Sequence, residues 1–252
     1  MPKQRIDTMT NAATIGVVGY HNTGKTTLIC KLIERLREQG YSVSTIKNIP
    51  KDEFYMDVEG KDTWKHGESG ARVVVASTSD ETAFIMKTGM PLGDILRITD
   101  SMTAPDVILV EGHKTEAIPK IVLGEMPIED EDDVRRYDPA TGDFEKLLSY
   151  IIETIEVKKV FNRLPGMNCG KCGYGDCMGM AVAIFRGEKA ISDCLMQGGF
   201  MRATVDGKEI PMGPFVQDIV SKTIFGMVAS LKGVDYTTID ADITIEIKHD
   251  RR

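Results

Sequence analysis

Residues 19–26 read Gly-Tyr-His-Asn-Thr-Gly-Lys-Thr, so two glycines separated by four residues are followed at once by a lysine and a hydroxyl side chain. This G-x-x-x-x-G-K-[ST] pattern is typical of a phosphate-binding loop, in which glycines let backbone N–H groups turn toward phosphate oxygens. A helix that begins directly after the loop adds the positive end of its dipole. The pattern predicts a nucleotide-binding loop, provided that a strand precedes it and a helix follows.

The flanking residues supply that context. Residues 14–20 form a β-branched run, and the segment after Gly24 repeats apolar side chains at helical spacing until Gly40. We expect further strands at residues 41–48, 71–78, 82–88, 105–112 and 119–125, and a closing helix at 144–155. Residues 129–138 are acidic without periodicity and predict a solvated loop. The alternation predicts an α/β fold, a P-loop sheet with helices on both of its faces.

The loop and a distant carboxylate form a candidate site. The candidate nucleotide contacts are Gly19, Asn22, Thr23, Gly24, Lys25, Thr26 and Thr27. Lys25 can reach the β- and γ-phosphates, and the Thr26 hydroxyl can bind Mg²⁺. Glu111 ends a buried strand and is the candidate acidic partner of the metal and, with Lys25, a candidate catalytic residue; the alternative is an ordinary carboxylate at a strand end. Asp57 is a second candidate for the shell around Mg²⁺, whereas His21 is expected to be a spectator.

Four of the five cysteines cluster in a short segment, which spaces them as Cys-x2-Cys-x4-Cys with the fourth after sixteen more residues. They are Cys169, Cys172, Cys177 and Cys194. The polar N-terminus resembles no secretory signal, so we expect a cytoplasmic protein whose thiols bind metal rather than form disulfides. Zinc and a [4Fe–4S] cluster both accept four cysteines, and burial for packing alone is a third reading. One Cys-x-x-Cys pair and the intervening glycines favour the cluster, while Cys30 is expected in the core of the first helix.

Composition bounds the other functions. The chain has 252 residues, 42% hydrophobic and 27% charged, and a net charge of −7 without any long basic cluster. We therefore expect no nucleic-acid partner, and the strand-sized apolar runs predict no membrane span. The expected organisation is a disordered lead-in at 1–13, a nucleotide-binding domain at 14–158, a [4Fe–4S] domain at 159–200 and a small α+β unit at 201–252. In this last unit we expect a hairpin turning at Asp206-Gly207, a helix at 214–233 whose apolar stripe is core, and a strand at 241–249.

Residues 14–125 resemble the MobB family of nucleotide-binding proteins in molybdopterin-guanine dinucleotide synthesis. The matching segments are GYHNTGKTTL, STIKN, DVEGKDTWKHGESGARVVVAS and DVILVEGHKTEAIPKIVL. The resemblance implies an α/β P-loop fold, a homodimer, GTP with Mg²⁺, weak GTP hydrolysis, and partnership with the guanylyltransferase that attaches GMP to molybdopterin, with molybdo- or tungsto-enzymes as further partners. Asn48 stands where the family often has histidine, so no role of that histidine is transferred.

Residues 160–200 are similar to a second family, the small [4Fe–4S] domain of the corrinoid iron–sulfur protein. The matching residues are the Leu164-Pro165-Gly166 lead-in and the segment NCGKCGYGDC. This resemblance implies a low-potential cluster on the four cysteines.

Three functions follow from the two modules. The first is a GTP-binding accessory protein of molybdenum or tungsten cofactor maturation with a fused cluster domain. The second is a nucleotide-gated electron-transfer protein, and the third is a non-catalytic adaptor in which the cluster is structural. The motif does not identify the nucleotide base, since the chain has no [NT]-K-x-D string.

Overall fold

The computed structural model describes residues 9–49, 57–128, 133–196, 203–205, 208–210, 212 and 214–231. The chain divides into two compact units, Met1–Val160 and Phe161–Arg252.

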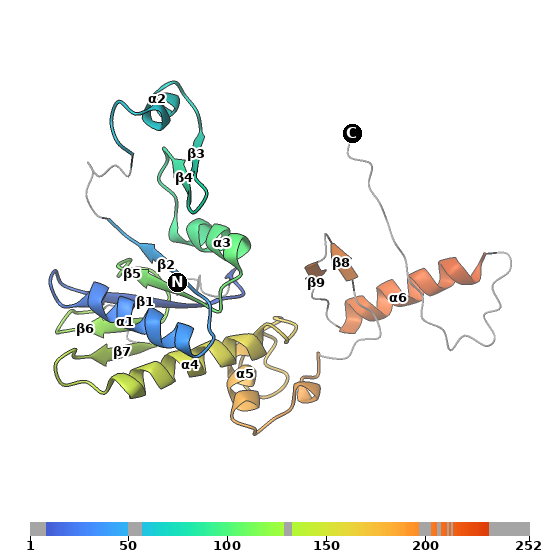
Figure 1. The fold of residues 1–252 in the computed structure, drawn as a ribbon. Helices are drawn as coiled ribbons and strands as arrows, with labels where there is room; N and C mark the ends of the chain where they lie inside the picture. Colours follow the sequence, from blue (N-terminus) through green and yellow to red (C-terminus); the bar gives the residue numbers. More distant parts are fainter. Residues whose placement is uncertain are drawn as a thin grey trace. The chain divides into compact units, whose positions relative to one another are not determined.

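The first unit is built on a five-stranded sheet with the order β2-β5-β1-β6-β7 (Figure 1). Its strands are β1 (Ala13–Gly19), β2 (Val43–Lys47), β5 (Val107–Glu111), β6 (Lys120–Leu123) and β7 (Val134–Tyr137). Every pairing in this sheet is parallel. The loops that follow β1, β2 and β5 therefore leave from the same edge of the sheet.

Helices cover both faces of this sheet, as predicted. Helices α1 (Lys25–Glu38) and α4 (Phe144–Phe161) pack on one face, and α3 (Leu92–Thr103) packs on the other. In α1 the buried residues recur at helical spacing and face the same core as the buried residues of α4; they are Leu28, Ile29, Leu32 and Leu36. Burying an apolar stripe of this size stabilises the layer by roughly 1.5–3 kcal/mol per large side chain.

The predicted strands at 71–78 and 82–88 exist but do not join the parallel sheet. After α2 (Asp62–Glu68) the chain forms β3 (Val73–Ser77) and β4 (Thr82–Met86), which pair antiparallel as a separate two-stranded sheet (Figure 1). Of β3 only Val74 is buried, so the apolar composition of these strands does not reflect a position inside the main sheet.

Two expectations for the first unit were wrong. Residues 129–138 were expected to be a solvated loop, but Val134–Tyr137 forms the edge strand β7, whose two arginines are exposed. The lead-in was expected to be disordered through residue 13, but Thr10 and Ala12 are buried, and the N–H groups of Asn11 and Ala12 donate to the Asp100 carboxylate.

The second unit contains α5 (Cys177–Phe185), a short 3-10 turn (Ile191–Asp193), the strands β8 (Ala203–Val205) and β9 (Lys208–Ile210), and α6 (Pro214–Ala229). β8 and β9 pair antiparallel, which confirms the predicted hairpin, although its Asp206-Gly207 turn and the expected strand at 241–249 lie outside the described residues. The apolar stripe of α6 was expected to be core, but Val216, Ile219 and Met227 are 45%, 47% and 67% exposed.

Within the described ranges, no helix combines the length and the apolar content that crossing a bilayer requires.

Candidate functional site

The phosphate loop joins the end of β1 to the start of α1 through two residues in the left-handed region. Asn22 has φ 60° and Gly24, the residue that precedes α1, has φ 87°. Gly19 is required for space, because an added Cβ would lie 2.7 Å from Thr23 Oγ1 and 2.8 Å from the Leu123 carbonyl oxygen. The local geometry therefore explains why glycine stands at both motif positions: Gly19 lacks space for a side chain, and Gly24 has a positive φ.

Lys25 folds back over this loop. Its Nζ donates to the carbonyl oxygens of Gly19 at 3.1 Å and Tyr20 at 2.5 Å. Phosphate oxygens accept stronger, charge-assisted hydrogen bonds than carbonyls do, so a bound phosphate would compete well for this ammonium group.

Thr26 and Glu111, predicted from separate parts of the sequence, lie together. Thr26 Oγ1 is 3.3 Å from both Oε1 and Oε2 of Glu111. Glu111 ends β5, next to β1, which leads into the loop. Hydroxyl and carboxylate oxygens are the ligands that Mg²⁺ prefers, so this donor set fits the metal.

Sequence reasoning missed Lys47, which also contacts Glu111. Its Nζ lies 3.3 Å from Oε1, and the two side chains are 56% and 14% exposed respectively. β2 and β5 pair with Lys47 directly opposite Glu111. The signal that would identify Lys47 is the strand register, which the sequence does not display.

The turn after Glu111 is tightly held. Asn48 N–H donates to the Glu111 carbonyl oxygen at 2.9 Å, and a Cβ on Gly112 (φ 92°) would come within 3.0 Å of Asn48 Cβ. His113 is also left-handed, at φ 53°. Burial lowers the pKa of His113 despite the opposing charge of Glu116, so its imidazole is neutral at physiological pH.

Asp57 lies elsewhere. Its Oδ1 accepts from the Val58 N–H at 2.9 Å and from Thr63 Oγ1 at 2.8 Å, next to the start of α2. Its Oδ2 is buried without a hydrogen-bond partner among the described residues. The structure thus brings Thr26 and Glu111 together and gives Asp57 contacts in its own segment.

The cysteine loop of the second unit is shaped by residues with positive φ. Asn168 has φ 45°, and the glycines between the cysteines have φ 64°, 89° and 74°; they are Gly170, Gly173 and Gly175. Asn168 N–H donates to Cys177 Sγ at 3.3 Å, and Asn168 Oδ1 accepts from the Cys177 N–H at 3.1 Å. Asp176 begins α5 by accepting from the Gly179 N–H at 2.7 Å.

The other three cysteines of this segment lie near enough to Cys177 to influence its ionisation. Burial raises the pKa of Cys177, and the neighbouring Cys194, Cys169 and Cys172 raise it further, against the opposing hydrogen bond from Asn168. Nevertheless, no three His, Cys, Asp or Glu side chains in the described segments form a group that could hold a metal ion. Zinc requires four sulfurs at about 2.3 Å from one centre, whereas the larger [4Fe–4S] core holds its four thiolates farther apart. By its chemistry, a set of four thiols fits either a zinc ion or a [4Fe–4S] cluster.

Cys30 is separate from this set. It was expected in the core of α1, but it is exposed, because the buried stripe of the helix passes through the adjacent Leu28 and Ile29. Cys30 therefore has no packing role of the kind predicted.

A parallel α/β sheet with a phosphate loop at its carboxyl edge, followed by a four-cysteine segment, defines a P-loop protein with an appended cysteine module. A family model described as "Molybdopterin guanine dinucleotide synthesis protein B", or MobB, matches residues 14–139. A second model, described as "Putative Fe-S cluster", matches residues 164–196. The chain belongs to the MobB family.

The chain is also similar to individual proteins of known name or structure. A "Putative molybdopterin-guanine dinucleotide biosynthesis adapter protein" of Methanocaldococcus jannaschii is 34% identical over 240 residues, which cover 92% of this chain and 97% of the relative. The "Molybdopterin-guanine dinucleotide biosynthesis adapter protein" of Haemophilus influenzae is 39% identical over 43% of this chain and 61% of its own length. The crystal structure of Bacillus subtilis MobB covers 56% of this chain and 97% of its own, with 19% identity and a TM-score of 0.45.

Proposed function

We propose that this protein is a GTP-binding adapter of molybdenum or tungsten cofactor biosynthesis, which assists the conversion of molybdopterin to its guanine dinucleotide form and carries a [4Fe–4S] cluster. Membership of the MobB family supports this role, as do the names of its relatives, which are adapter proteins of molybdopterin-guanine dinucleotide biosynthesis. The observation that carries the nucleotide part is the meeting of Thr26 with Glu111 beside the phosphate loop.

The loop residues have distinct tasks in this proposal. Lys25 leaves the carbonyls of Gly19 and Tyr20 and donates to the β- and γ-phosphates, while the loop N–H groups and Thr27 face the remaining phosphate oxygens. Thr26 and Glu111 would hold Mg²⁺, which would supply positive charge against the phosphates. Asp57 is retained only as a candidate for the outer shell. We expect this protein to hydrolyse GTP slowly, so that GTP stays bound while the protein acts as an adapter.

Titration of the full chain with a fluorescent GTP analogue, with and without Mg²⁺, tests the nucleotide site. Removing the charge-assisted hydrogen bonds of Lys25 by Lys25→Ala should weaken binding by about ten- to a hundredfold. Lys65→Ala on α2 is the matched control, because the Lys65 ammonium group pairs with the exposed carboxylate of Asp62 on the same helix. Equal affinities of Lys25→Ala and wild type would contradict the proposed site, and rapid turnover without a partner would contradict the adapter role.

The cluster part rests on the spacing of the four cysteines, on the proximity of the other three to Cys177 and on the matching family model. Cys169, Cys172, Cys177 and Cys194 would ligate the cluster, and the loop N–H groups would donate to its sulfurs and tune its potential. An anaerobic preparation should contain about four irons and four sulfides per chain. Zinc at one per chain without sulfide would instead identify a structural zinc site.

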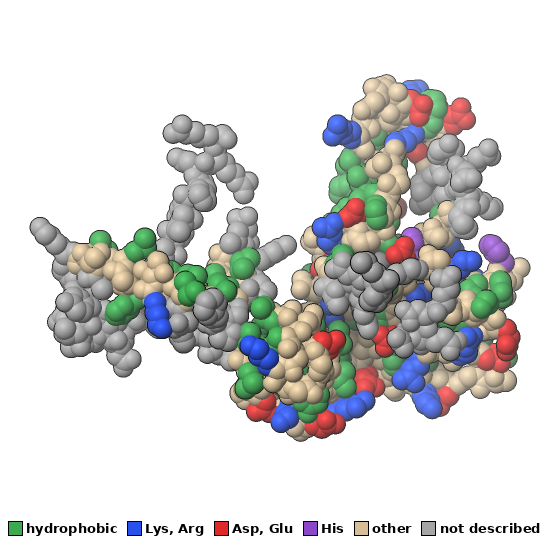
Figure 2. All heavy atoms as spheres, turned by 180° about the vertical axis from the view of Figure 1, so that it is seen from behind, with side chains coloured by type: hydrophobic (Ala, Val, Ile, Leu, Met, Phe, Trp, Pro, Cys, Tyr) green, Lys and Arg blue, Asp and Glu red, His purple; other side chains and the backbone are tan. Residues whose placement is uncertain are grey.

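We also propose a cytoplasmic homodimer that docks the guanylyltransferase. The β3–β4 sheet supports self-association, because its exposed apolar residues pair directly across the strands, Val73 with Met86 and Val75 with Phe84. Figure 2 shows hydrophobic side chains on this upper part of the first unit, and acidic and basic side chains interspersed over the whole face shown. The mixed charges give no support to nucleic-acid binding.

A second candidate function is a nucleotide-gated electron-transfer protein. The observation that favours it is that a phosphate loop and a four-cysteine segment lie in the same chain. Redox titration of the anaerobic protein with and without GTP separates the functions. A midpoint that shifts with nucleotide supports gating, and an unchanged midpoint supports the adapter.

A further inference from the structure

Lys47 forms an ion pair with Glu111, the carboxylate that would bind the metal in the proposed site. The Oε1 atom of Glu111 lies 3.3 Å from Lys47 Nζ and 3.3 Å from Thr26 Oγ1, and Oε2 lies 3.3 Å from the same hydroxyl. Both oxygens of this carboxylate are therefore already engaged.

The backbone fixes this arrangement. Lys47 and Glu111 are the last residues of β2 and β5, and they are register partners in the parallel sheet. Asn48 N–H continues the pairing by donating to the Glu111 carbonyl oxygen at 2.9 Å. The two side chains thus leave the sheet side by side, and their contact does not depend on a flexible loop.

Charge explains why the pair matters. Glu111 is 14% exposed, and a carboxylate so shielded from water favours a nearby cation, whereas Lys47 is 56% exposed and can leave at little cost. Mg²⁺ binds carboxylate oxygens at about 2.0–2.1 Å, which would bring it against the lysine ammonium. Two cations repel at such a separation, so Glu111 can bind one of them closely at a time.

We propose that Lys47 is an internal counter-cation that competes with divalent metal for Glu111 and keeps the metal site closed when nucleotide is absent. The ammonium group of Lys25 is likewise engaged within the protein, because it donates to the carbonyl oxygens of Gly19 and Tyr20. The phosphates of an arriving nucleotide provide new acceptors for a displaced ammonium, so nucleotide and metal bind cooperatively. Lys47 is a positioning residue in this inference, which rests on the proposed function through the role of Glu111 as a metal ligand.

The test is a Mn²⁺ titration of the full chain without nucleotide, followed by electron paramagnetic resonance, because Mn²⁺ accepts the same oxygen ligands as Mg²⁺. Lys47→Met should tighten Mn²⁺ binding about two- to fivefold, the range for loss of a partly exposed ion pair. Lys47→Arg, which keeps the charge, should bind Mn²⁺ no more tightly than wild type. Both variants should keep the wild-type circular dichroism spectrum.

A control variant separates the effect of the Lys47–Glu111 contact from the effect of removing any positive charge near the site. Lys25→Met removes a charge from the same loop region but from a side chain that touches carbonyls rather than Glu111, so it should tighten Mn²⁺ binding less than Lys47→Met does. Equal Mn²⁺ affinities of wild type and Lys47→Met, or equal effects of the two Met variants, would overturn the inference. Failure of wild type to bind the fluorescent GTP analogue would instead overturn the proposed function.

Discussion

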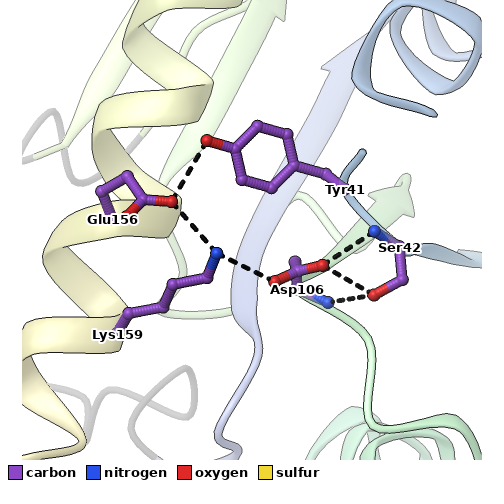
Figure 3. A network of polar contacts seen from close by, with 5 residues as sticks. All are labelled: Tyr41, Ser42, Asp106, Glu156 and Lys159. Atoms are coloured by element: carbon purple, nitrogen blue, oxygen red, sulfur yellow. Dashed lines mark hydrogen bonds and ion pairs between the residues drawn. The ribbon is translucent and has the colours of Figure 1, made fainter. Parts of the chain in front are cut away.

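Asp106, at the residue scale, is a carboxylate held by three donors. Its Oδ2 accepts from the Ser42 N–H at 2.8 Å and from Ser42 Oγ at 2.7 Å, while Oδ1 lies 3.1 Å from Lys159 Nζ (Figure 3). Lys159 also contacts Glu156 at 3.0 Å, which accepts from the Tyr41 hydroxyl. Burial opposes ionisation of Asp106, but the hydrogen bonds from Ser42 and Lys159 outweigh it and lower the pKa.

We predict that Asp106→Asn lowers the free energy of unfolding by about 1 kcal/mol at pH 7, with a smaller effect in acid. Because the folded pKa lies below the unfolded value near 3.9, the ionised form stabilises the fold above that value, and this contribution is lost as pH falls through the folded pKa. Urea unfolding at pH 7, 5 and 3.5, followed by circular dichroism, measures the difference between variant and wild type. A difference that stays constant with pH would contradict the prediction. Asp62→Asn, in an exposed pair, should change stability little.

Two glycines of the cysteine loop allow a matched test of space. An added Cβ at Gly170 would lie 2.8 Å from the Gly175 carbonyl oxygen, whereas at Gly173 it would meet nothing within 4 Å, although both have positive φ. Each Ala substitution costs about 1–2 kcal/mol of backbone strain, and only Gly170→Ala adds a backbone clash. We predict that Gly170→Ala lowers iron and sulfide content more than Gly173→Ala does. Equal iron content in the two variants would contradict this account of the loop.

At the scale of elements, the β3–β4 sheet has two different faces. Val74 is buried on one face, while Val73, Val75, Phe84 and Met86 are 42–56% exposed on the other. Apolar residues paired in this way form the kind of contiguous surface that marks an interaction site.

Phe84→Asp should therefore shift the chain from dimer toward monomer, because association would bury an unpaired carboxylate. Size-exclusion chromatography with light scattering on the full chain, over a range of concentrations, measures the shift. Ser79→Asp, in the turn between the strands, carries the same charge outside the apolar pairs and should leave the dimer intact. A Phe84→Asp protein that remains dimeric would place the interface elsewhere.

Sequence patterns predict which segments form helices and strands better than they predict which of these segments pair with one another. The buried run at residues 107–111 and the spacing of α1 were sufficient for the central layers. The strand Val134–Tyr137 was missed because an edge strand with two exposed arginines resembles a charged loop. In the site, the motif identifies Lys25 and Thr26, but Lys47 meets Glu111 only through strand register, which depends on pairing between residues 64 positions apart. The isolation of β3–β4 from the main sheet likewise depends on tertiary contacts.

For the whole molecule, the chain divides into two compact units, each of which carries one of the candidate sites. We predict that Cys169→Ser removes most of the iron but changes affinity for the fluorescent GTP analogue by less than about twofold, since the phosphate loop lies wholly in the first unit. Iron content and nucleotide titration of the same anaerobic preparation measure both properties. A large loss of nucleotide affinity would show that the cluster and the loop are coupled, and would favour the electron-transfer function.

The central position of β1 has a consequence for how the protein is made. β1 leaves the ribosome before both of its neighbours, β5 and β6, which come roughly a hundred residues later. At usual rates of synthesis this apolar strand waits about 5–20 s for a partner. Sheets closed by such distant segments fold slowly, since loop closure precedes any gain from pairing. The nascent chain should therefore require protection from aggregation until β6 has emerged, and only then can the phosphate loop take its shape.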